Sequence, residues 1–330
     1  MNNNDIVITS RIRLARNLKN YRFPVKMNQE ESEKVIKEAT DAINRINLNY
    51  KLQYMRDLSD TQKNSLIENH LISPALAEKK EKAAFLLSPD KKVSIMLNEE
   101  DHIRIQTLDK GMSLKECWEL STKIDDVIEE SVDYAFDHEL GYVTSCPTNI
   151  GSGMRASVMI HLPAISITNQ IEKLLYGVSQ LGVAVRGVYG EGTKSLGHLY
   201  QISNQGTLGV SEETLIDKIT QIVNQIVEKE EKMREHLKKN NFDQLEDEFY
   251  RAYGLLTNAR KMKTEEAMRL ISLLKLGRDM GMIDVAAGKD LYELMTKIQP
   301  SNLSSIAEKE LLPKERDSKR AEIIRHELLS

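Results

Sequence analysis

Residues 151–163 read Gly-Ser-Gly-Met-Arg-Ala-Ser-Val-Met-Ile-His-Leu-Pro, and this stretch decides the fold class. Its first six letters match the G-x-G-x-x-A pattern of dinucleotide-binding folds, in which a helix follows the glycines. Here polar and apolar residues instead alternate from Met154 to Leu162, which is typical of a β-strand, and Pro163 ends it. The alternation therefore disfavours a dinucleotide-binding fold and predicts a strand after a glycine-rich turn.

Similar patterns occur on both sides of this strand, between residues 5 and 209. Residues 83–88 and 92–97, joined by Pro89-Asp90-Lys91, predict a hairpin, and residues 102–106 alternate as a strand. Ser113 and Glu116 have capping-box spacing and predict a helix that runs toward Phe136. Further elements are predicted as strands over 8–14, 183–189 and 198–203, and as a helix over 169–181. This part of the chain therefore predicts an α+β fold with a mainly antiparallel sheet.

After Ser211 the pattern becomes helical almost throughout. Ser211, with two glutamates behind it, predicts the N-terminus of a long helix that ends near Lys239. Further helices are predicted over 242–253, 264–276, 290–298 and 317–329, with breaks at Pro300 and Pro313. We therefore expect a catalytic domain over residues 1–235 and an all-helical C-terminal domain over residues 236–330.

The composition excludes several classes of protein. Among 330 residues, 46 Lys and Arg face 50 Asp and Glu, a net charge of −4 that disfavours a protein coating nucleic acid. No apolar run approaches the roughly 20 residues that cross a bilayer, and the N-terminus lacks a signal-peptide pattern. Two cysteines, Cys117 and Cys146, are too few for a disulfide framework or a thiolate zinc site. We expect a cytoplasmic protein with no membrane contact.

Arginines on the predicted strands suggest the chemistry. A single arginine is most often a solvated surface residue. A set of five on or beside strands is harder to explain in that way, because the guanidinium keeps its proton and its planar fork matches phosphate oxygens. Such a set could neutralise a triphosphate without a P-loop lysine. In the glycine-rich stretch 187–195, Thr193 stands where the P-loop lysine must follow the second glycine, so a P-loop is disfavoured. The five are Arg11, Arg13, Arg104, Arg155 and Arg186.

Acidic residues accompany these arginines. Asn98-Glu-Glu-Asp-His102 precedes the strand that carries Arg104, and Glu191 follows Arg186 in a glycine-rich loop. A cluster of this kind is commonly a polar turn. Beside an arginine-lined phosphate site, however, paired carboxylates would suit a cationic phosphoryl acceptor.

Four blocks, in this order, resemble the signatures of the phosphagen (ATP:guanidino) kinase family: Thr9-Ser-Arg-Ile-Arg-Leu-Ala-Arg-Asn17, 98–102, Cys146-Pro-Thr-Asn-Ile-Gly-Ser-Gly-Met-Arg-Ala156 and 185–191. The resemblance implies a central antiparallel sheet flanked by helices, with Mg²⁺-ATP bound by arginines. It implies these ATP-binding residues: Thr9, Ser10, Arg11, Ile12, Arg13, His70, Arg104, Arg155, Ala156, Ser157, Val158, Met159, Arg186, Gly187, Val188, Tyr189 and Gly190.

The same resemblance implies an acceptor site. Glu100 and Glu191 match the carboxylates that orient the acceptor guanidinium and accept its proton, and Cys146 matches the active-site cysteine. A Cys146 thiolate would position the guanidinium by its charge and would not act as a nucleophile. Mg²⁺ is expected to arrive on ATP, without protein ligands of its own, and the arginines and Mg²⁺ would stabilise the transferring group. Cys117 matches nothing in the family and is expected in the core.

Two features differ from the small-molecule members of the family. Those enzymes carry a helical domain before the Ser-Arg-Ile-Arg block, which begins here near residue 9, and they usually have Asp where Gln201 stands. The C-terminal extension contains Arg316-Asp-Ser-Lys-Arg-Ala321, in which Arg316 and Arg320 could share a helix face and hold one phosphate. Spacing alone favours the alternative, a solvated charged helix.

Together these features resemble the protein-arginine kinase branch of the family. The resemblance implies phosphorylation of arginine side chains in proteins with exposed arginines, a McsA-type activator, inactivation of a CtsR repressor and delivery of marked proteins to a ClpC–ClpP protease. It also implies a homodimer, and an allosteric phosphoarginine-sensing segment made of Arg316, Asp317, Arg320 and Ala321. Two alternatives stay open: a small-molecule guanidino kinase, and a catalytically weak adaptor for a repressor or protease.

Overall fold

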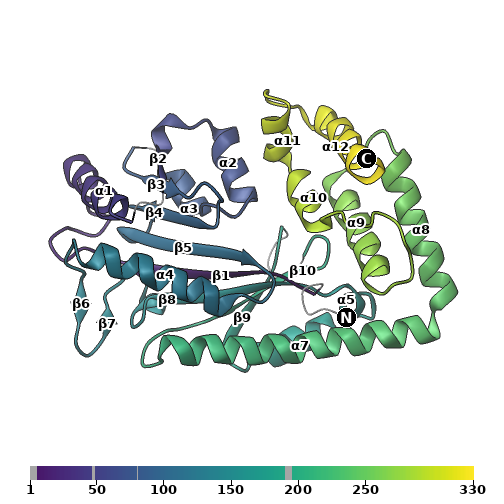
Figure 1. The fold of residues 1–330 in the computed structure, drawn as a ribbon, viewed down its shortest axis with the longest axis horizontal. Helices are drawn as coiled ribbons and strands as arrows, with labels where there is room; N and C mark the ends of the chain where they lie inside the picture. The colour runs from purple at the N-terminus through teal and green to yellow at the C-terminus, as the bar shows by residue number, and fades with distance from the viewer. Residues whose placement is uncertain (1–5, 47–48, 80, 190–194) are drawn as a thin grey trace.

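A single antiparallel sheet organises the first two thirds of the chain (Figure 1). The structure is a computed structural model and describes residues 6–46, 49–79, 81–189 and 195–330. Within these ranges, eight strands lie in the order β2-β3-β4-β5-β1-β8-β10-β9. Their bounds are β1 (Val7–Arg16), β2 (Lys51–Tyr54), β3 (Ala84–Leu87), β4 (Val93–Leu97), β5 (Ile103–Lys110), β8 (Met154–His161), β9 (Val183–Gly187) and β10 (Leu199–Asn204). A separate small hairpin consists of β6 (Phe136–Asp137) and β7 (Gly141–Tyr142).

The strand predictions are confirmed. The predicted hairpin is β3–β4, in which Ala84 lies opposite Leu97. The residues after the G-x-G-x-x-A glycines form β8, which pairs with β1 and β10, so no helix begins there. The sequence did not indicate β2, and β5 extends four residues beyond the predicted end at Gln106.

Seven helices accompany the sheet in the described ranges: α1 (Gln29–Asn44), α2 (Asp60–Glu68), α3 (Pro74–Glu78), α4 (Leu114–Glu129), α5 (Pro163–Ile167), α6 (Ile171–Ser179) and α7 (Glu212–Asn240). The predicted capping box of α4 is wrong. The Ser113 hydroxyl donates to the Lys110 carbonyl (2.8 Å) and makes no cap bond to the helix. The helix also ends at Glu129, well before Phe136. In contrast, the Ser211 hydroxyl caps α7 as predicted.

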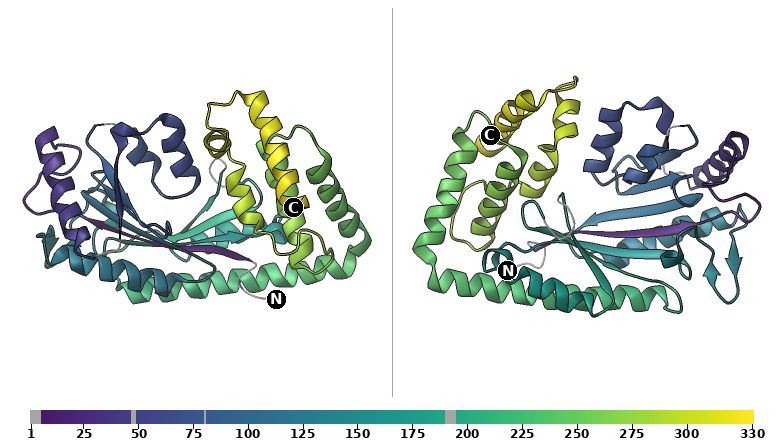
Figure 2. Two further views of the ribbon diagram at one scale, coloured as in Figure 1. Left: turned by 45° about the horizontal axis from the view of Figure 1, so that its top comes forward. Right: turned by 180° about the vertical axis from the view of Figure 1, so that it is seen from behind.

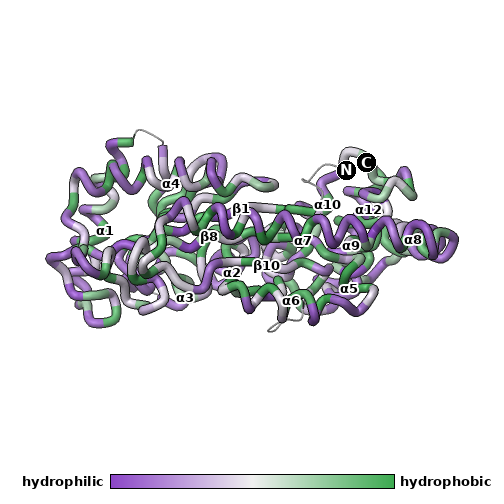
Figure 3. The backbone as a smooth tube through the Cα atoms, turned by 90° about the horizontal axis from the view of Figure 1, so that it is seen from below, coloured by the Kyte–Doolittle hydropathy of each residue, from purple (hydrophilic) through white to green (hydrophobic). Residues whose placement is uncertain are grey.

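The two faces of the sheet differ because successive side chains of a strand point to opposite sides. One face packs Ile12, Ile105 and Val158 into a large apolar core with residues of α1, α4, α6 and α7. Figure 3 views the molecule from the side of α4 and α7, with β1 and β8 behind them. The other face carries Arg11, Arg13 and their neighbours, and we name it the arginine face. At the β3–β4 end, α2 and α3 cover this face over a small core that includes Phe85 and Met96.

The C-terminal helices form a second body around their own core. They are α8 (Phe242–Asn258), α9 (Thr264–Asp279), α10 (Leu291–Lys297), α11 (Pro300–Ile306) and α12 (Pro313–Leu329). The long helix α7 runs from beneath the sheet into this body, across the boundary expected after residue 235 (Figure 2). Pro300 and Pro313 stand in the first turns of α11 and α12, where a missing N–H costs nothing, and α11 was not predicted.

The second core also includes sheet residues. Ile8, Met159 and Leu199 pack with the C-terminal helices, so the body lies against one end of the sheet. None of the helices in the described ranges is long and apolar enough to span a bilayer.

Candidate active site

Strand register gathers four arginines on the arginine face. Arg155 of β8 lies opposite Arg13 of β1, and Arg104 of β5 lies opposite Ala15. Residues paired in this way have Cβ atoms about 5 Å apart on the same face. Burial, and next the positive charges of Arg11, Arg104 and Arg155, hold the pKa of Arg13 below its ordinary value. Burial lowers the pKa of Arg11 to about 10. These side chains thus concentrate positive charge on one face of the sheet.

The predicted acceptor residues lie beside these arginines. A cavity of about 170 Å³ is lined by Arg13, Arg104 and Arg155 together with Glu100 and Cys146. The Cys146 Sγ lies 3.1 Å from Thr148 Oγ1, and Cys146 is close enough to Arg155 to affect its electrostatic environment. Three predicted phosphate ligands, one predicted carboxylate and the predicted cysteine therefore share one small space.

The turn 98–102 separates the roles of two adjacent glutamates. Glu99 is buried and ion-paired with Arg104 at 2.6 Å, whereas the Glu100 side chain is 44% exposed and lies 3.2 Å from Arg104. Asn98 takes a left-handed conformation (φ 59°), which Asn tolerates better than most residues. The sequence offered the acidic run but no signal for which glutamate would hold Arg104.

Asp101 is a second residue that the sequence interpretation missed. Its buried Oδ1 accepts from Asn17 Nδ2 (2.7 Å) and from the Ser145 N–H (2.7 Å). The Ser145 hydroxyl in turn donates to the Glu100 carbonyl (2.8 Å). These bonds fix the Cys146 loop against the turn that carries Glu100.

A neighbouring hollow contains the other part of the predicted nucleotide site. Its lining includes Thr9, Arg11, His70, Met159 and Gln201. Arg11 donates to Gln201 Oε1 (2.9 Å) and to the Ser157 hydroxyl (3.2 Å). Gln201 is therefore a neutral hydrogen-bond acceptor that orients Arg11.

The end of α2 positions His70. The Leu71 N–H bonds the Leu66 carbonyl (2.9 Å) and the His70 N–H bonds the Ile67 carbonyl (2.9 Å), which is a Schellman motif with His70 in the left-handed position. The His70 ring then lies 3.1 Å from the Tyr189 hydroxyl. Burial lowers the pKa of His70 to about 4, so the ring is neutral at physiological pH.

Several residues of the predicted ATP-binding blocks do not reach the arginine face. Because side chains alternate along a strand, some of these residues point to the opposite face. Ile12, Ala156 and Val158 lie there in the main core, and the Ser10 hydroxyl forms a buried hydrogen bond there. Val188 lies in the second core. Arg186 of β9, in contrast, lies opposite Gln201 of β10 and therefore on the arginine face, where it is exposed. Its charge interacts with that of Arg155, and Gly187 ends the strand. Gly190 and Glu191 lie outside the described residues.

The remaining predicted residues are placed as follows. Cys117 is buried as expected, and burial raises the pKa of its thiol to about 12. On α12, Arg320 and Ala321 are each 1% exposed, so the solvated-helix alternative is wrong for them. Arg320 donates to the carbonyls of Met262 (2.8 Å) and Ile298 (3.1 Å) and to Asp317 (2.9 Å). Arg316 is half-buried.

No group of three or more His, Cys, Asp or Glu side chains suited to a metal occurs in the described part of the chain.

Two family models match most of the chain. The model described as "ATP:guanido phosphotransferase, C-terminal catalytic domain" matches residues 31–233. The model described as "Protein-arginine kinase McsB C-terminal domain" matches residues 242–330.

Several bacterial relatives are similar along nearly the whole length. A protein-arginine kinase from Caldanaerobacter subterraneus is 48% identical over 98% of this chain and 97% of its own. Proteins of the same name from Desulforamulus reducens and Brevibacillus brevis are 46% and 45% identical, over 99% and 98% of this chain and 93% and 92% of their own.

Solved structures share the fold. A lombricine kinase superposes with a TM-score of 0.61 at 24% identity, over 69% of this chain and 67% of its own. A duplicated taurocyamine kinase from Schistosoma mansoni, with bound transition state analogue components, gives 0.63 at 22% identity, over 79% of this chain and 38% of its own. At these identities the likeness shows the fold alone: a guanidino-kinase sheet with its helices.

Proposed function

The chain belongs to the ATP:guanido phosphotransferase family and, within it, to the protein-arginine kinases; from this premise we propose that it transfers the γ-phosphoryl group of ATP to arginine side chains of proteins. The observation that carries the proposal is the cavity in which Arg13, Arg104 and Arg155 converge with Glu100 and Cys146. It combines a site for phosphate oxygens with carboxylate and sulfur groups suited to a guanidinium.

The arginine face suits the phosphoryl donor. Fixed guanidinium groups stabilise the charge that spreads over the transferring phosphoryl oxygens, and removing one such group typically costs about 10²–10³ in rate. Because Gln201 and Ser157 already hold Arg11, and Glu99 holds Arg104, these side chains need little rearrangement to act. The residues that would hold the phosphates are cations and do not bind Mg²⁺ themselves. Mg²⁺ would therefore bind to the phosphates and supply further neutralisation of their charge.

Glu100 suits the acceptor. Its carboxylate is partly exposed and faces the same cavity as Cys146, so a guanidinium entering from solvent can reach both. A carboxylate that binds the guanidinium holds one nitrogen in line with the γ-phosphorus and accepts the proton that this nitrogen loses. Glu191 is the second carboxylate that the sequence predicts for this role. The exposure of Glu100 supports an acceptor attached to a protein surface.

A comparison of acceptors tests the proposal. The protein is incubated with Mg²⁺-ATP and an arginine-rich unfolded protein, free arginine or creatine, and products are identified by mass spectrometry at neutral pH, since phosphoarginine is acid-labile. We expect phosphoarginine on the protein and little product on the small molecules. Phosphorylation of free arginine or creatine without protein labelling would support the small-molecule alternative, and absence of any ATP turnover would support the adaptor.

We further propose the biological partners that the resemblance implies. These are a McsA-type activator, the CtsR repressor and the ClpC–ClpP protease, with a homodimer formed through the C-terminal helices. The McsB-type C-terminal match over residues 242–330 supports the dimer, and also a phosphoarginine-sensing role for the Arg316–Ala321 segment. Retention of ClpC by phosphorylated, but not by unmodified, substrate protein would test the proposed delivery to the protease.

A further inference from the structure

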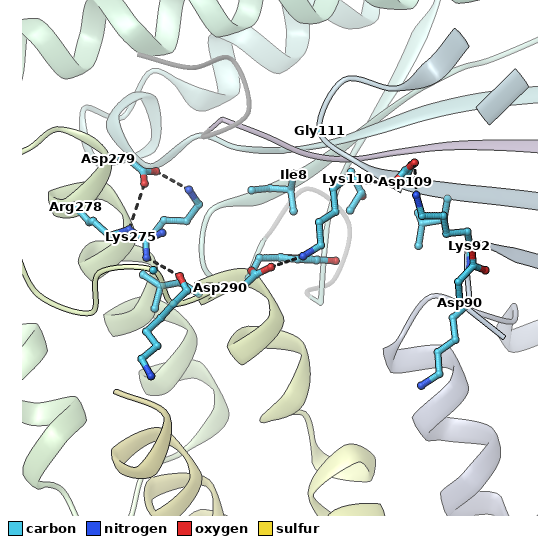
Figure 4. A pocket seen from close by; sticks show the side chains of 17 residues that line it. Ile8, Asp90, Lys92, Asp109, Lys110, Gly111, Lys275, Arg278, Asp279 and Asp290 are labelled. Carbon is cyan, nitrogen blue, oxygen red and sulfur yellow. Dashed lines mark hydrogen bonds and ion pairs between the residues drawn. The ribbon is translucent and has the colours of Figure 1, made fainter. Parts of the chain in front are cut away.

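The C-terminal body meets the arginine face at the start of α10. The Asp290 carboxylate caps this helix by accepting from the Glu293 N–H (2.9 Å) and pairs with Lys110 at the end of β5 (2.6 Å). Figure 4 shows Lys110 reaching across to Asp290, beside Ile8 of β1. The start of α10 is therefore connected to the C-terminal end of β5.

Lys110 and Asp290 both line an open pocket of about 860 Å³ that adjoins the nucleotide hollow. Tyr292 of α10 lines the cavity together with Thr9 and Leu108. The same Thr9 and Leu108 line the small hollow that contains Arg11 and His70. Tyr292 and the predicted phosphate ligand Arg11 thus line two spaces that share Thr9 and Leu108, although the two residues are far apart in the sequence.

A chain of polar contacts joins Tyr292 to the nucleotide hollow. The side-chain hydroxyl groups of Tyr292, Tyr189 and Thr296 lie close enough to interact with one another. The Tyr189 hydroxyl lies 3.1 Å from His70 Nε2, and the two rings are 5.5 Å apart. Tyr292 also interacts electrostatically with Arg11. Burial raises the pKa of Tyr292 well above its ordinary value, so it meets this cation as a neutral phenol.

We infer that Tyr292 is a nucleotide-positioning residue supplied by the C-terminal body, which holds Tyr189 against His70 and limits where Arg11 can lie. The inference rests on the proposed function, because it concerns the site proposed for ATP. The catalytic family model ends at residue 233, so Tyr292 lies outside the part of the chain that this model matches. The nucleotide site of this chain is therefore completed by a helix that the catalytic family model does not include.

The test removes one hydroxyl. Tyr292→Phe keeps the ring and removes the hydroxyl that interacts with Tyr189, and a typical side-chain hydrogen bond corresponds to about a 3- to 10-fold change in an equilibrium constant. We expect the Kd for Mg²⁺-ATP, measured without acceptor, to rise by about that factor, with KM for ATP rising equally. We expect kcat to stay within about twofold of the unmodified protein and the melting temperature to stay the same. The matched control is Tyr253→Phe, a half-buried tyrosine packed on the same core.

Two outcomes would overturn the inference: an unchanged Kd in Tyr292→Phe, or an equal rise in Tyr253→Phe. A double-variant cycle tests the route. If Tyr292 acts through Tyr189, adding Tyr292→Phe to Tyr189→Phe weakens ATP binding no further, whereas fully additive losses contradict that route. Because Kd is measured without acceptor, a protein that binds ATP but labels no arginine would refute the proposed function and leave this comparison valid.

Discussion

At the scale of single residues, Glu99 and Glu100 show how one turn gives neighbouring carboxylates different roles. Glu99 is 1% exposed and holds the Arg104 guanidinium, whereas Glu100 is exposed at the cavity. Breaking a buried pair leaves an uncompensated charge, which is far more costly than losing an exposed one. We therefore expect Glu99 to serve stability and ATP binding, and Glu100 to serve the acceptor.

The first prediction compares these two residues. We expect Glu100→Gln to lower kcat for protein phosphorylation by about 10²-fold or more, because a base and orienting group is lost, with the Kd for ATP and the melting temperature unchanged. We expect Glu99→Gln to lower the unfolding free energy by roughly 2–4 kcal/mol and to weaken ATP binding. Single-turnover transfer and calorimetry measure both, and the reverse pattern would contradict these assignments.

His70 allows a second prediction, about pH. Its folded pKa is about 4, against an ordinary value of 6.5. Between these values the unfolded chain binds a proton that the folded chain does not, so stability falls as pH falls from 6.5 toward 4. When the pH falls from 7 to 4.5, the unfolding free energy of both proteins falls. We expect it to fall by about 2 kcal/mol less in His70→Asn than in the unmodified protein. Denaturant titrations at both pH values measure this difference, with His138→Asn, at an exposed position, as the control.

At the scale of elements, Asp101 joins three segments that meet at the cavity. The bonds from Asn17 and Ser145 connect the end of β1 and the Cys146 loop to the turn before β5. Asn17 Oδ1 also accepts from the His102 N–H (2.9 Å). The placement of Cys146 opposite Glu100 therefore depends on this buried carboxylate.

The third prediction concerns this connection. We expect Asp101→Ala to lower the unfolding free energy by about 2–4 kcal/mol, since two buried donors lose their acceptor. We also expect KM for the protein acceptor to rise. Asp137→Ala is a matched control, because its exposed Oδ1 also accepts two hydrogen bonds, here both from backbone N–H groups (both 2.9 Å). Chemical denaturation and steady-state kinetics compare the two, and similar losses in both variants would argue against the role of Asp101.

At the scale of the whole molecule, α2 and α11 form a second contact between the catalytic part and the C-terminal body. The Glu68 carboxylate accepts from the N–H groups of Ser301 (2.9 Å) and Asn302 (2.8 Å). Asn302 Oδ1 bonds Ser65 and Asn69. Arg316 of α12 interacts with the Glu68 charge, and Glu68 is two residues before His70. The predicted phosphoarginine segment is thus adjacent to the helix that positions the nucleotide-site histidine.

The fourth prediction follows from this arrangement. If Arg316 binds phosphoarginine, Arg316→Ala should reduce the stimulation of ATP turnover by added phosphoarginine by about tenfold, without changing the Kd for ATP in its absence. Arg316 is the better target than Arg320, because Arg320 also ties α12 to two backbone carbonyls. Lys314→Ala, an exposed residue of the same helix, is the control. Undiminished stimulation in Arg316→Ala would return the segment to a purely structural role.

Much of the fold could be predicted because the relevant signals are local. Alternation over 154–162 identified β8, and the cap at Ser211 identified the start of α7. The same local reasoning failed at Ser113, because its hydroxyl bonds the Lys110 carbonyl in a turn that no spacing rule reveals. It also could not separate Glu99 from Glu100, which depends on the direction that each side chain takes across a turn.

The amino-acid sequence by itself determined which residue types alternate, and so which arginines of β1 share a face: Arg11 and Arg13 point one way, and Arg16 points the other, to Asp125. Only the tertiary structure decided that Arg155 lies opposite Arg13, and that Tyr292 lines a pocket that shares Thr9 and Leu108 with the hollow of Arg11. The physical reason is that side-chain periodicity is a property of one segment, whereas strand register and helix docking depend on the simultaneous packing of segments that are far apart in the chain.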